Sequence, residues 1–405
     1  MKLLPLLAIN AIAMQALAVG LWLFQSSPLP NSAGIPPAVI AHVALALGIL
    51  PLILAAMGYL VPVLSHSRKP PRALQAIPLL AWLGGASLIA GLSGVVAFAA
   101  ASHAAAGLAL TAAVGMGSWM AWRAQRMLGP PHAGLAWYLA ATGFLILALL
   151  AVPAMDLWPG QRAALRLFHL HANLLGFVGL TAIGTLQVLL PTAAGRPDPT
   201  AAGRLSSDLG YACGGVMLIA LGAALAATRL PMGGSATPLA LLGAALYLLA
   251  PLRMGTRWAA AYSERIGRLH GAAASLALAC FGLIGLLFAG VGHTLGFLAG
   301  RDAIAGFIVA FLLPLVSGAA TQLLPVWLRP GLQQEWHLRL RDRLGRLAGL
   351  RALLMVCGGL ALGFGWLQGL WLAVAGVGLF AFTAIPALLG ALRDRRTTSS
   401  GFRQA

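Results

Sequence analysis

HANLLGFVGLTAIGTLQVLLPTAAGRP, residues 171–197, indicates the fold class of this chain. It contains no charged residue before Arg196, and an apolar run of about 20 residues is long enough to cross a bilayer as a helix. The rest of the chain has the same character, since 60% of its 405 residues are hydrophobic and only 8% are charged. A soluble domain carries about 25% charged residues. We therefore predict an all-α polytopic membrane protein, a single transmembrane domain over residues 1–405, with the lipid bilayer as its partner.

Apolar stretches separated by charges and by Pro and Gly clusters indicate twelve spans. The first follows Met1 and Lys2 directly, and because no small-residue cleavage site succeeds it, we interpret it as a retained span rather than a signal peptide. The predicted spans lie near residues 3–24, 36–63, 74–96, 101–122, 134–154, 165–191, 207–228, 236–252, 267–291, 303–328, 346–366 and 369–392.

The net charge of +18 indicates topology rather than nucleic-acid binding. Positive charge beside spans tends to stay in the cytoplasm. We therefore predict cytoplasmic N- and C-termini in a bacterial-type inner membrane. The segment 329–346, rich in arginine, is expected to lie along the anionic inner leaflet, with partner binding as the alternative. In this topology all Lys and Arg residues lie inside except Arg162, Arg166, Arg229 and Arg301.

The quoted stretch has two counterparts in the chain, AHVALALGILPLILAAMGYLVPVLSHSRKP at residues 41–70 and AGFIVAFLLPLVSGAATQLLPVWLRP at residues 305–330. Each has a proline near its end (Pro62, Pro191 or Pro325) and then leaves the membrane through a basic residue followed by proline. They form the second, sixth and tenth spans, which favours three blocks of four helices. Chance likeness among leucine-rich helices is the alternative. The blocks would cover about residues 1–130, 131–262 and 263–392, followed by a basic tail at 393–405.

Five of the nine histidines fall on the outer side of this topology. An ionisable or coordinating side chain within a span is costly and therefore indicates function. Neutral imidazole is a common ligand of haem iron and of copper. We expect the five outer histidines to gather at one depth of the bundle as a cofactor site. They are His42, His103, His169, His171 and His293.

Two of these histidines are neighbours on one helix. His169 and His171 are separated by about 200° around a helix, so both cannot point into one site. His171 stands twenty residues before its proline, as His42 does. We predict His42 and His171 as ligands of haem or copper, with His169 and His103 as auxiliary cofactor-binding residues. The alternative is that these are helix-end histidines hydrogen-bonded to the backbone without any ligand.

Glycines follow the two predicted ligands, and the sequence offers little other chemistry. Gly48, Gly176 and Gly179 are expected to leave room for a flat cofactor. The carboxylates near the spans lie at span ends, which argues against a proton- or sodium-coupled pump. Neither a Walker loop nor an HExxH motif is present in the chain, so nucleotide hydrolysis and zincin proteolysis find no support.

Twelve spans in three blocks, with outward-lying histidines on the second and sixth, resemble subunit I of the haem-copper oxidase superfamily. That resemblance implies that His42 is an axial ligand of a low-spin haem and that His171 binds copper. The segment HLHANLLGF, from His169 to Phe177, is also similar to the HxHxxxxGF signature of NnrS-type membrane proteins. Those twelve-span proteins contain haem and copper and are associated with nitric oxide stress.

The chain departs from both families. Oxidases carry further histidines on the seventh and tenth spans, whereas here the seventh span has none and the tenth has Ala305 at the repeat position. The complete haem-copper centre of an oxidase cannot be built without them, which argues against oxygen reduction by that mechanism. NnrS-type proteins also carry their motif near the start of the chain rather than in the middle.

We expect a haem- or copper-binding membrane protein that acts in respiration-linked redox chemistry or in handling nitric oxide or metal. Two alternatives stay open at this point. A permease for a small solute suits twelve spans, and an assembly subunit would keep the fold without a cofactor. A membrane partner subunit is compatible with each of these functions.

Overall fold

The computed structural model describes residues 3–27, 34–65, 67–127, 129–228, 233–298 and 303–401. Its regular structure in these ranges is entirely helical, and twelve helices are long and apolar enough to cross a membrane. The predicted all-α class and the number of spans are thus confirmed. The elements are α1 (Leu3–Gln25), α2 (Pro37–His42), η2 (Val43–Ile49), α3 (Leu50–Leu64), η3 (Arg72–Gln75), α4 (Ala76–Leu92), α5 (Phe98–Gln125), α6 (Gly134–Leu157), η4 (Pro159–Gln161), α7 (Arg162–His171), η5 (Ala172–Gly179), α8 (Leu180–Ala193), α9 (Ala201–Ala226), α10 (Gly233–Ile266), α11 (Ala272–Thr294), α12 (Ala303–Gly306), η7 (Phe307–Leu312), α13 (Leu313–Leu328), α14 (Glu335–Leu344), α15 (Ala348–Gly363) and α16 (Gly369–Gly401).

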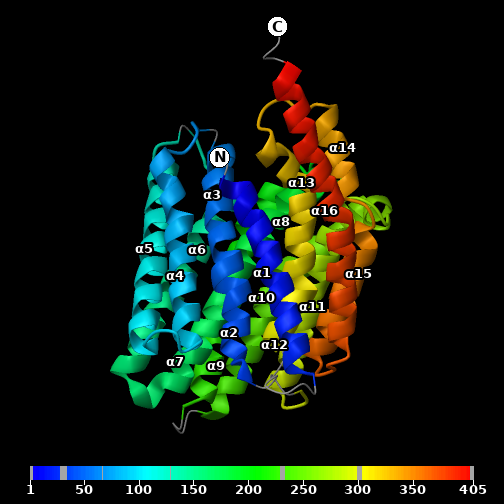
Figure 1. Ribbon diagram of the computed structural model, residues 1–405. Coiled ribbons are helices and arrows are strands. Elements are labelled where there is room, and N and C mark those ends of the chain that lie inside the picture. Colours follow the sequence, from blue (N-terminus) through cyan, green and yellow to red (C-terminus); the bar gives the residue numbers. More distant parts are fainter. Residues whose placement is uncertain are drawn as a thin grey trace.

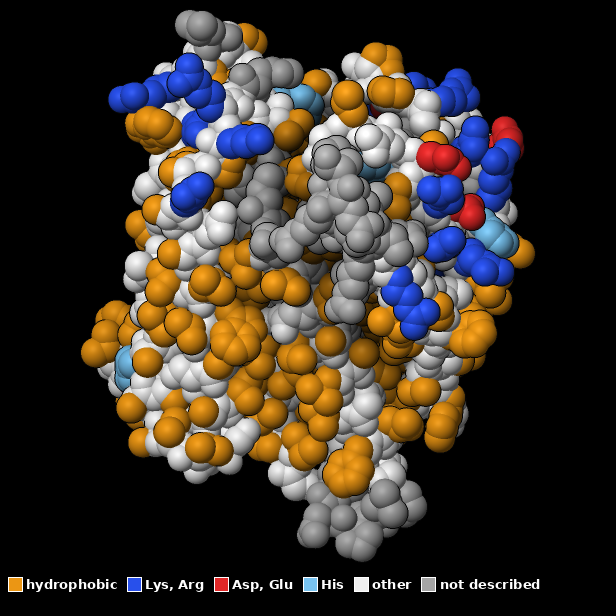
Figure 2. All heavy atoms as spheres, turned by 45° about the horizontal axis from the view of Figure 1, so that its top comes forward, with side chains coloured by type: hydrophobic (Ala, Val, Ile, Leu, Met, Phe, Trp, Pro, Cys, Tyr) orange, Lys and Arg blue, Asp and Glu red, His pale blue; other side chains and the backbone are white. Residues whose placement is uncertain are grey.

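The helices form one upright bundle with its two chain ends on the same side (Figure 1). The start of α1 and the end of α16 lie at the top of that view, while α2, α7 and α12 lie at the bottom. Lys and Arg side chains gather at the end that holds the termini, next to a broad belt of hydrophobic side chains (Figure 2). We call this the basic end of the bundle.

The eighth span extends further than its hydropathy suggests. We predicted an end at residue 252, but α10 continues to Ile266, with a kink at Tyr262. The extension carries Arg253 and Arg257, which face two carboxylates that are almost fully buried. Because the arginines have ionic partners, the helix continues past the apolar run.

Three stretches of π-helix interrupt the second, sixth and tenth spans. They are η2, η5 and η7, and they begin 19, 19 and 18 residues before Pro62, Pro191 and Pro325. The π-helix is rare and is frequently found at functional sites. The three related stretches of sequence therefore share an unusual backbone feature at nearly the same position.

Side chains from neighbouring helices bond to the first two π-helical stretches. The amide of Asn10 in α1 donates to the Leu47 carbonyl of η2 at 2.7 Å. The hydroxyl of Tyr247 in α10 donates to the Leu175 carbonyl of η5 at 3.1 Å. A polar backbone group in a lipid-facing fold must be satisfied internally, so both side chains help to stabilise the altered helical turns.

Spans two, six and ten meet around a cavity of about 100 Å³ at the centre of the bundle. Its walls come mainly from α3, α8 and α13 and are almost entirely apolar. Tyr138 of α6 also lines it and shares a hydrogen bond of 2.9 Å with Thr185 of α8. The sixth and tenth spans are the most buried of the candidate spans, so their lack of charge suits the interior.

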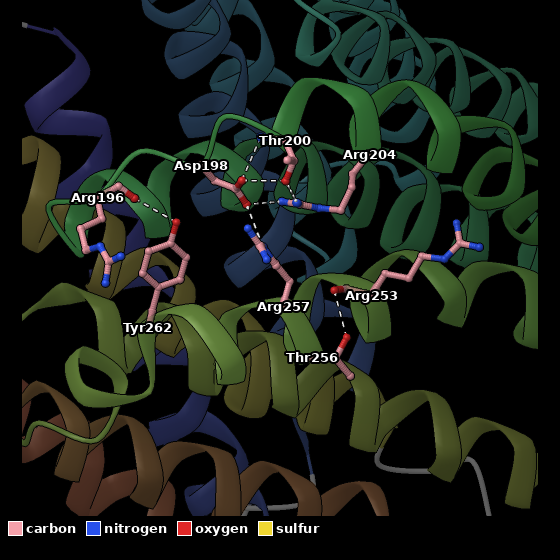
Figure 3. A network of polar contacts seen from close by, with 8 residues as sticks. All are labelled: Arg196, Asp198, Thr200, Arg204, Arg253, Thr256, Arg257 and Tyr262. Atoms are coloured by element: carbon pink, nitrogen blue, oxygen red, sulfur yellow. Dashed lines mark hydrogen bonds and ion pairs between the residues drawn. The ribbon is translucent and has the colours of Figure 1, made fainter.

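A polar network ties the loop before α9 to α10 at the basic end (Figure 3). The carboxylate of Asp198 accepts hydrogen bonds from the backbone and hydroxyl of Thr200 at 2.9 and 2.7 Å, and from Arg204 at 2.8 Å. Arg257 of α10 lies 3.9 Å from the same carboxylate. The Tyr262 hydroxyl donates to the Arg196 carbonyl at 2.9 Å. This network holds the loop before α9 against α10.

Candidate functional site

The two predicted ligands occupy matching places in their spans. His42 is the last residue of α2 and His171 is the last residue of α7, and a π-helical stretch begins at the next residue in each case. Both helices end at the bottom of Figure 1, opposite the chain termini. We call this the histidine end, because the helix ends that carry His103 and His293 lie there too.

Each of the two imidazoles is held through one ring nitrogen. Nδ1 of His42 donates to the Ala38 carbonyl at 2.7 Å, and Nδ1 of His171 donates to the Leu167 carbonyl at 2.8 Å. A carbonyl can only accept, so Nδ1 carries the proton and Nε2 of the neutral ring keeps a free lone pair. Within the described residues neither Nε2 atom has a hydrogen-bond partner. Both side chains are half-buried, so each offers one available nitrogen ligand.

His169 is held at both ring nitrogens. Its Nδ1 donates to the Ala148 carbonyl of α6 at 2.8 Å, and the side-chain amide of Asn173 lies 3.3 Å from its Nε2. Asn173 also donates to the backbone carbonyl of His169 at 2.9 Å. The ring of His169 is therefore fixed across the seam between α6 and α7. The hydrogen bonds of the His169 ring reach a neighbouring helix, whereas the ring of His171 bonds only within its own helix.

The histidines of this end lie in two pairs. His169 lies near His42, and His171 lies near His293. His293 resembles the two predicted ligands, since its Nδ1 donates to the Leu298 carbonyl at 2.9 Å. The sixth span thus places one histidine near the second span and another near the ninth.

His103 has a different environment from the other histidines at this end. Its Nδ1 donates to the Ala99 carbonyl at 2.8 Å, but its Nε2 lies 3.3 Å from a carboxylate oxygen of Asp156. Arg162 approaches the other oxygen of that carboxylate at 3.9 Å. The His103 and Asp156 side chains are about half exposed, at 50% and 43%. As placed here, His103 would have to leave Asp156 before its Nε2 could bind a cofactor.

The expectation that three glycines leave room for a cofactor is wrong. A Cβ atom at Gly48 would lie 3.2 Å from Met14, and one at Gly176 would lie 2.6 Å from the ring of Phe144. At Gly179 the Tyr247 hydroxyl fills the place of the missing side chain. These glycines therefore allow helices to pack closely around the π-helical stretches.

The third π-helical stretch is closed by packing. Ala310 of η7 lies so close to Gly282 of α11 and Gly359 of α15 that neither position could carry a side chain. All six residues of η7 are buried. Ala305 of the tenth span is buried as well. The tenth span therefore has no imidazole at the position that matches His42 and His171, and its π-helical stretch is closely packed.

The donor set limits what the site can bind. Among the described residues, no three His, Cys, Asp or Glu side chains gather closely enough to hold a metal ion. A copper site in a protein commonly needs three such ligands, whereas haem iron needs one or two axial ligands because the porphyrin supplies the others. The described residues therefore offer fewer ligands than a copper site commonly needs. His66 lies outside the described residues.

No family model matches the chain, and no curated protein is significantly similar to it.

Proposed function

We propose that this protein is an integral membrane haem protein related to the haem-copper oxidase and NnrS-type proteins, with His42 and His171 as iron ligands. The hydrogen-bonding pattern of these two imidazoles carries the proposal. Each donates from Nδ1 to a backbone carbonyl one turn earlier, and no residue that the structure describes bonds to its Nε2. That arrangement is the usual one for a metal-bound histidine, because the Nδ1 bond orients the ring and makes Nε2 a better donor to the metal.

The surrounding residues suit a haem in three ways. His169, fixed by Ala148 and Asn173, lies within electrostatic range of His42 and would position the edge of the site. Arg162 and Arg166 belong to α7, which ends at His171, and provide positive charge for haem propionates. Phe168 and Leu170, the partly buried apolar neighbours of these histidines, would offer apolar contact to the ring. Bound haem would supply one-electron transfer or the binding of a small gas, which agrees with a role in respiration-linked redox chemistry or nitric oxide handling.

We also propose that the bundle consists of three four-helix blocks related by pseudo-threefold symmetry. The matching π-helical stretches and the shared central cavity support this arrangement. Permeases are more often built from two halves, so three blocks favour the haem protein over a transporter. The blocks would then have diverged in chemistry, with histidines kept in the first two and close packing in the third.

The test is the haem content of purified protein from a haem-replete host, determined as the pyridine haemochrome. We expect haem in the wild type and its loss in His42→Ala and in His171→Ala. His270→Ala is the matched control, since His270 lies exposed on the loop between α10 and α11 at the basic end. Wild-type protein that is folded but free of haem would overturn the proposal. Such a preparation would leave the permease and the assembly subunit as the remaining alternatives.

A further inference from the structure

We propose that a groove between α1 and α4 at the basic end binds one acyl chain of an anionic phospholipid, with the headgroup phosphate at Lys69. The groove therefore lies at the opposite end of the molecule from the histidine end defined above. Its volume is about 480 Å³, which is within the range of about 300–1,000 Å³ for small-molecule pockets.

The walls of the groove suit a hydrocarbon chain. The helices α1 and α4 both pack against α3, which forms the floor. Leu3, Leu54, Val63 and Leu74 contribute apolar side chains from these elements and from the segment before α4. Gly58 in the floor leaves space, because a Cβ atom there would meet only Leu74, at 3.4 Å. An unbranched apolar chain gains free energy for every methylene group that it buries here.

Most polar side chains of the groove come from the segment between α3 and α4, while Tyr59 of α3 also lines it. Those of the segment are Ser67, Lys69 and Gln75. A molecule that fills the groove must therefore be apolar along most of its length and polar at one end. A phospholipid has this character, and the helices around the groove belong to three of the candidate membrane spans.

The charge of the loop specifies an anionic headgroup. Arg68, Lys69 and Arg72 make no ion pair with any of the described residues. Arg123 of α5 fixes the loop by donating to the carbonyls of Arg68 and Lys69 at 3.1 and 3.4 Å. The loop backbone is thus held in place, while no carboxylate among the described residues pairs with these three basic side chains. A lipid phosphate with a net negative headgroup supplies it.

The experiment compares lipid retention by purified, delipidated full-length protein in native mass spectrometry. Phosphatidylglycerol and phosphatidylcholine with identical acyl chains are the two probes. We expect wild-type protein to retain phosphatidylglycerol about fivefold more than phosphatidylcholine, as one basic residue at a membrane surface allows. Lys69→Gln should lower this preference, because it removes the basic residue placed at the phosphate. Arg265→Gln is the matched control, because it removes the same charge at an exposed position away from the groove.

A second pair of variants tests the groove itself. Gly58→Leu fills the floor and should lower retention of both lipids, whereas Gly20→Leu on the exposed side of α1 should leave retention unchanged. Circular dichroism confirms that all four variants are folded. Equal retention by Lys69→Gln and Arg265→Gln, or by Gly58→Leu and Gly20→Leu, would overturn the proposal. So would displacement of the lipid by inorganic phosphate alone, or occupation of the groove by a second copy of the chain.

Discussion

The side-chain amide of Asn173 lies 3.3 Å from Nε2 of His169, so both ring nitrogens of this histidine have partners. His171, two residues later, uses only Nδ1. The two imidazoles of the HxH segment therefore differ in function if one of them binds iron. Nε2 of His171 is available to a ligand, whereas the ring of His169 is held by hydrogen bonds at both nitrogens.

This difference predicts unequal effects of substitution. His171→Ala should abolish haem binding, because the iron loses a ligand. His169→Ala and Asn173→Leu should weaken it by about tenfold, as loss of a group that orients a site usually does. Titration of the haem-free protein with hemin measures the affinities. Identical loss in His169→Ala and His171→Ala would show that the hydrogen-bonding pattern does not distinguish the two residues.

Tyr247 should stabilise the protein through the π-helical turn of the sixth span. Tyr247→Phe removes the donor to the Leu175 carbonyl and should lower the free energy of unfolding by about 1 kcal/mol. Tyr211→Phe is the matched control, since this tyrosine is 45% exposed on α9. Reversible unfolding in mixed detergent micelles measures both. A stability equal to that of Tyr211→Phe would contradict a structural role for this hydrogen bond.

Asp198 should make stability depend on pH. Burial tends to raise the pKa of its carboxyl, but the hydrogen bonds from Thr200 and Arg204 outweigh burial and leave the pKa lowered. A carboxyl with a lowered pKa in the folded state stabilises that state above the unfolded pKa of about 3.9, and the contribution is lost as the pH falls through the folded pKa.

Asp198→Asn should therefore destabilise the protein at neutral pH, by about 2 kcal/mol. The difference from wild type should shrink toward zero as the solution is acidified below the folded pKa. Glu264→Gln provides the control, since Glu264 is 79% exposed in its pair with Arg268. Thermal unfolding at a series of pH values gives the answer. A destabilisation that stays constant with pH would mean that charge is not the cause.

Arg351 should hold the amphipathic helix α14 against the bundle. This arginine is fully buried, and its guanidinium donates to the Leu344 carbonyl at 2.8 Å, to Thr383 at 3.0 Å and to Thr321 at 3.2 Å. Arg351→Met keeps much of the volume but leaves the end of α14 without its donor. We expect faster hydrogen exchange in residues 335–344, measured by mass spectrometry, with α6 unchanged. Unaltered exchange in α14 would refute this role.

The sequence predicts the spans because hydropathy and length are enough to define a membrane helix. It also predicts that His42 and His171 occupy matching places, since both stand twenty residues before a proline. The π-helical stretches could not be predicted in this way, because their apolar residues look the same in an α-helix. The hydrogen bond from Asn10 to the Leu47 carbonyl could not be predicted either, because it depends on which helix lies beside α1.

The close packing at the glycines could not be predicted, because it also depends on side chains from other spans. A glycine after a histidine indicates free space but does not show what fills it, and at Gly176 the ring of Phe144 comes from a different span. The extension of α10 was missed because arginines normally mark the end of a span. Arg253 instead pairs with the buried carboxylate of Asp208 at 2.7 Å. Such contacts depend on helix neighbours, which a single chain's pattern does not reveal.

The central claim is that the imidazoles at the histidine end bind haem iron. Its most direct test is the absorption difference spectrum of the purified wild-type protein, reduced with dithionite minus oxidised. We predict a Soret band with resolved α and β bands, all absent from the His42→Ala, His171→Ala double variant. A featureless difference spectrum from folded protein expressed with ample haem would contradict the account.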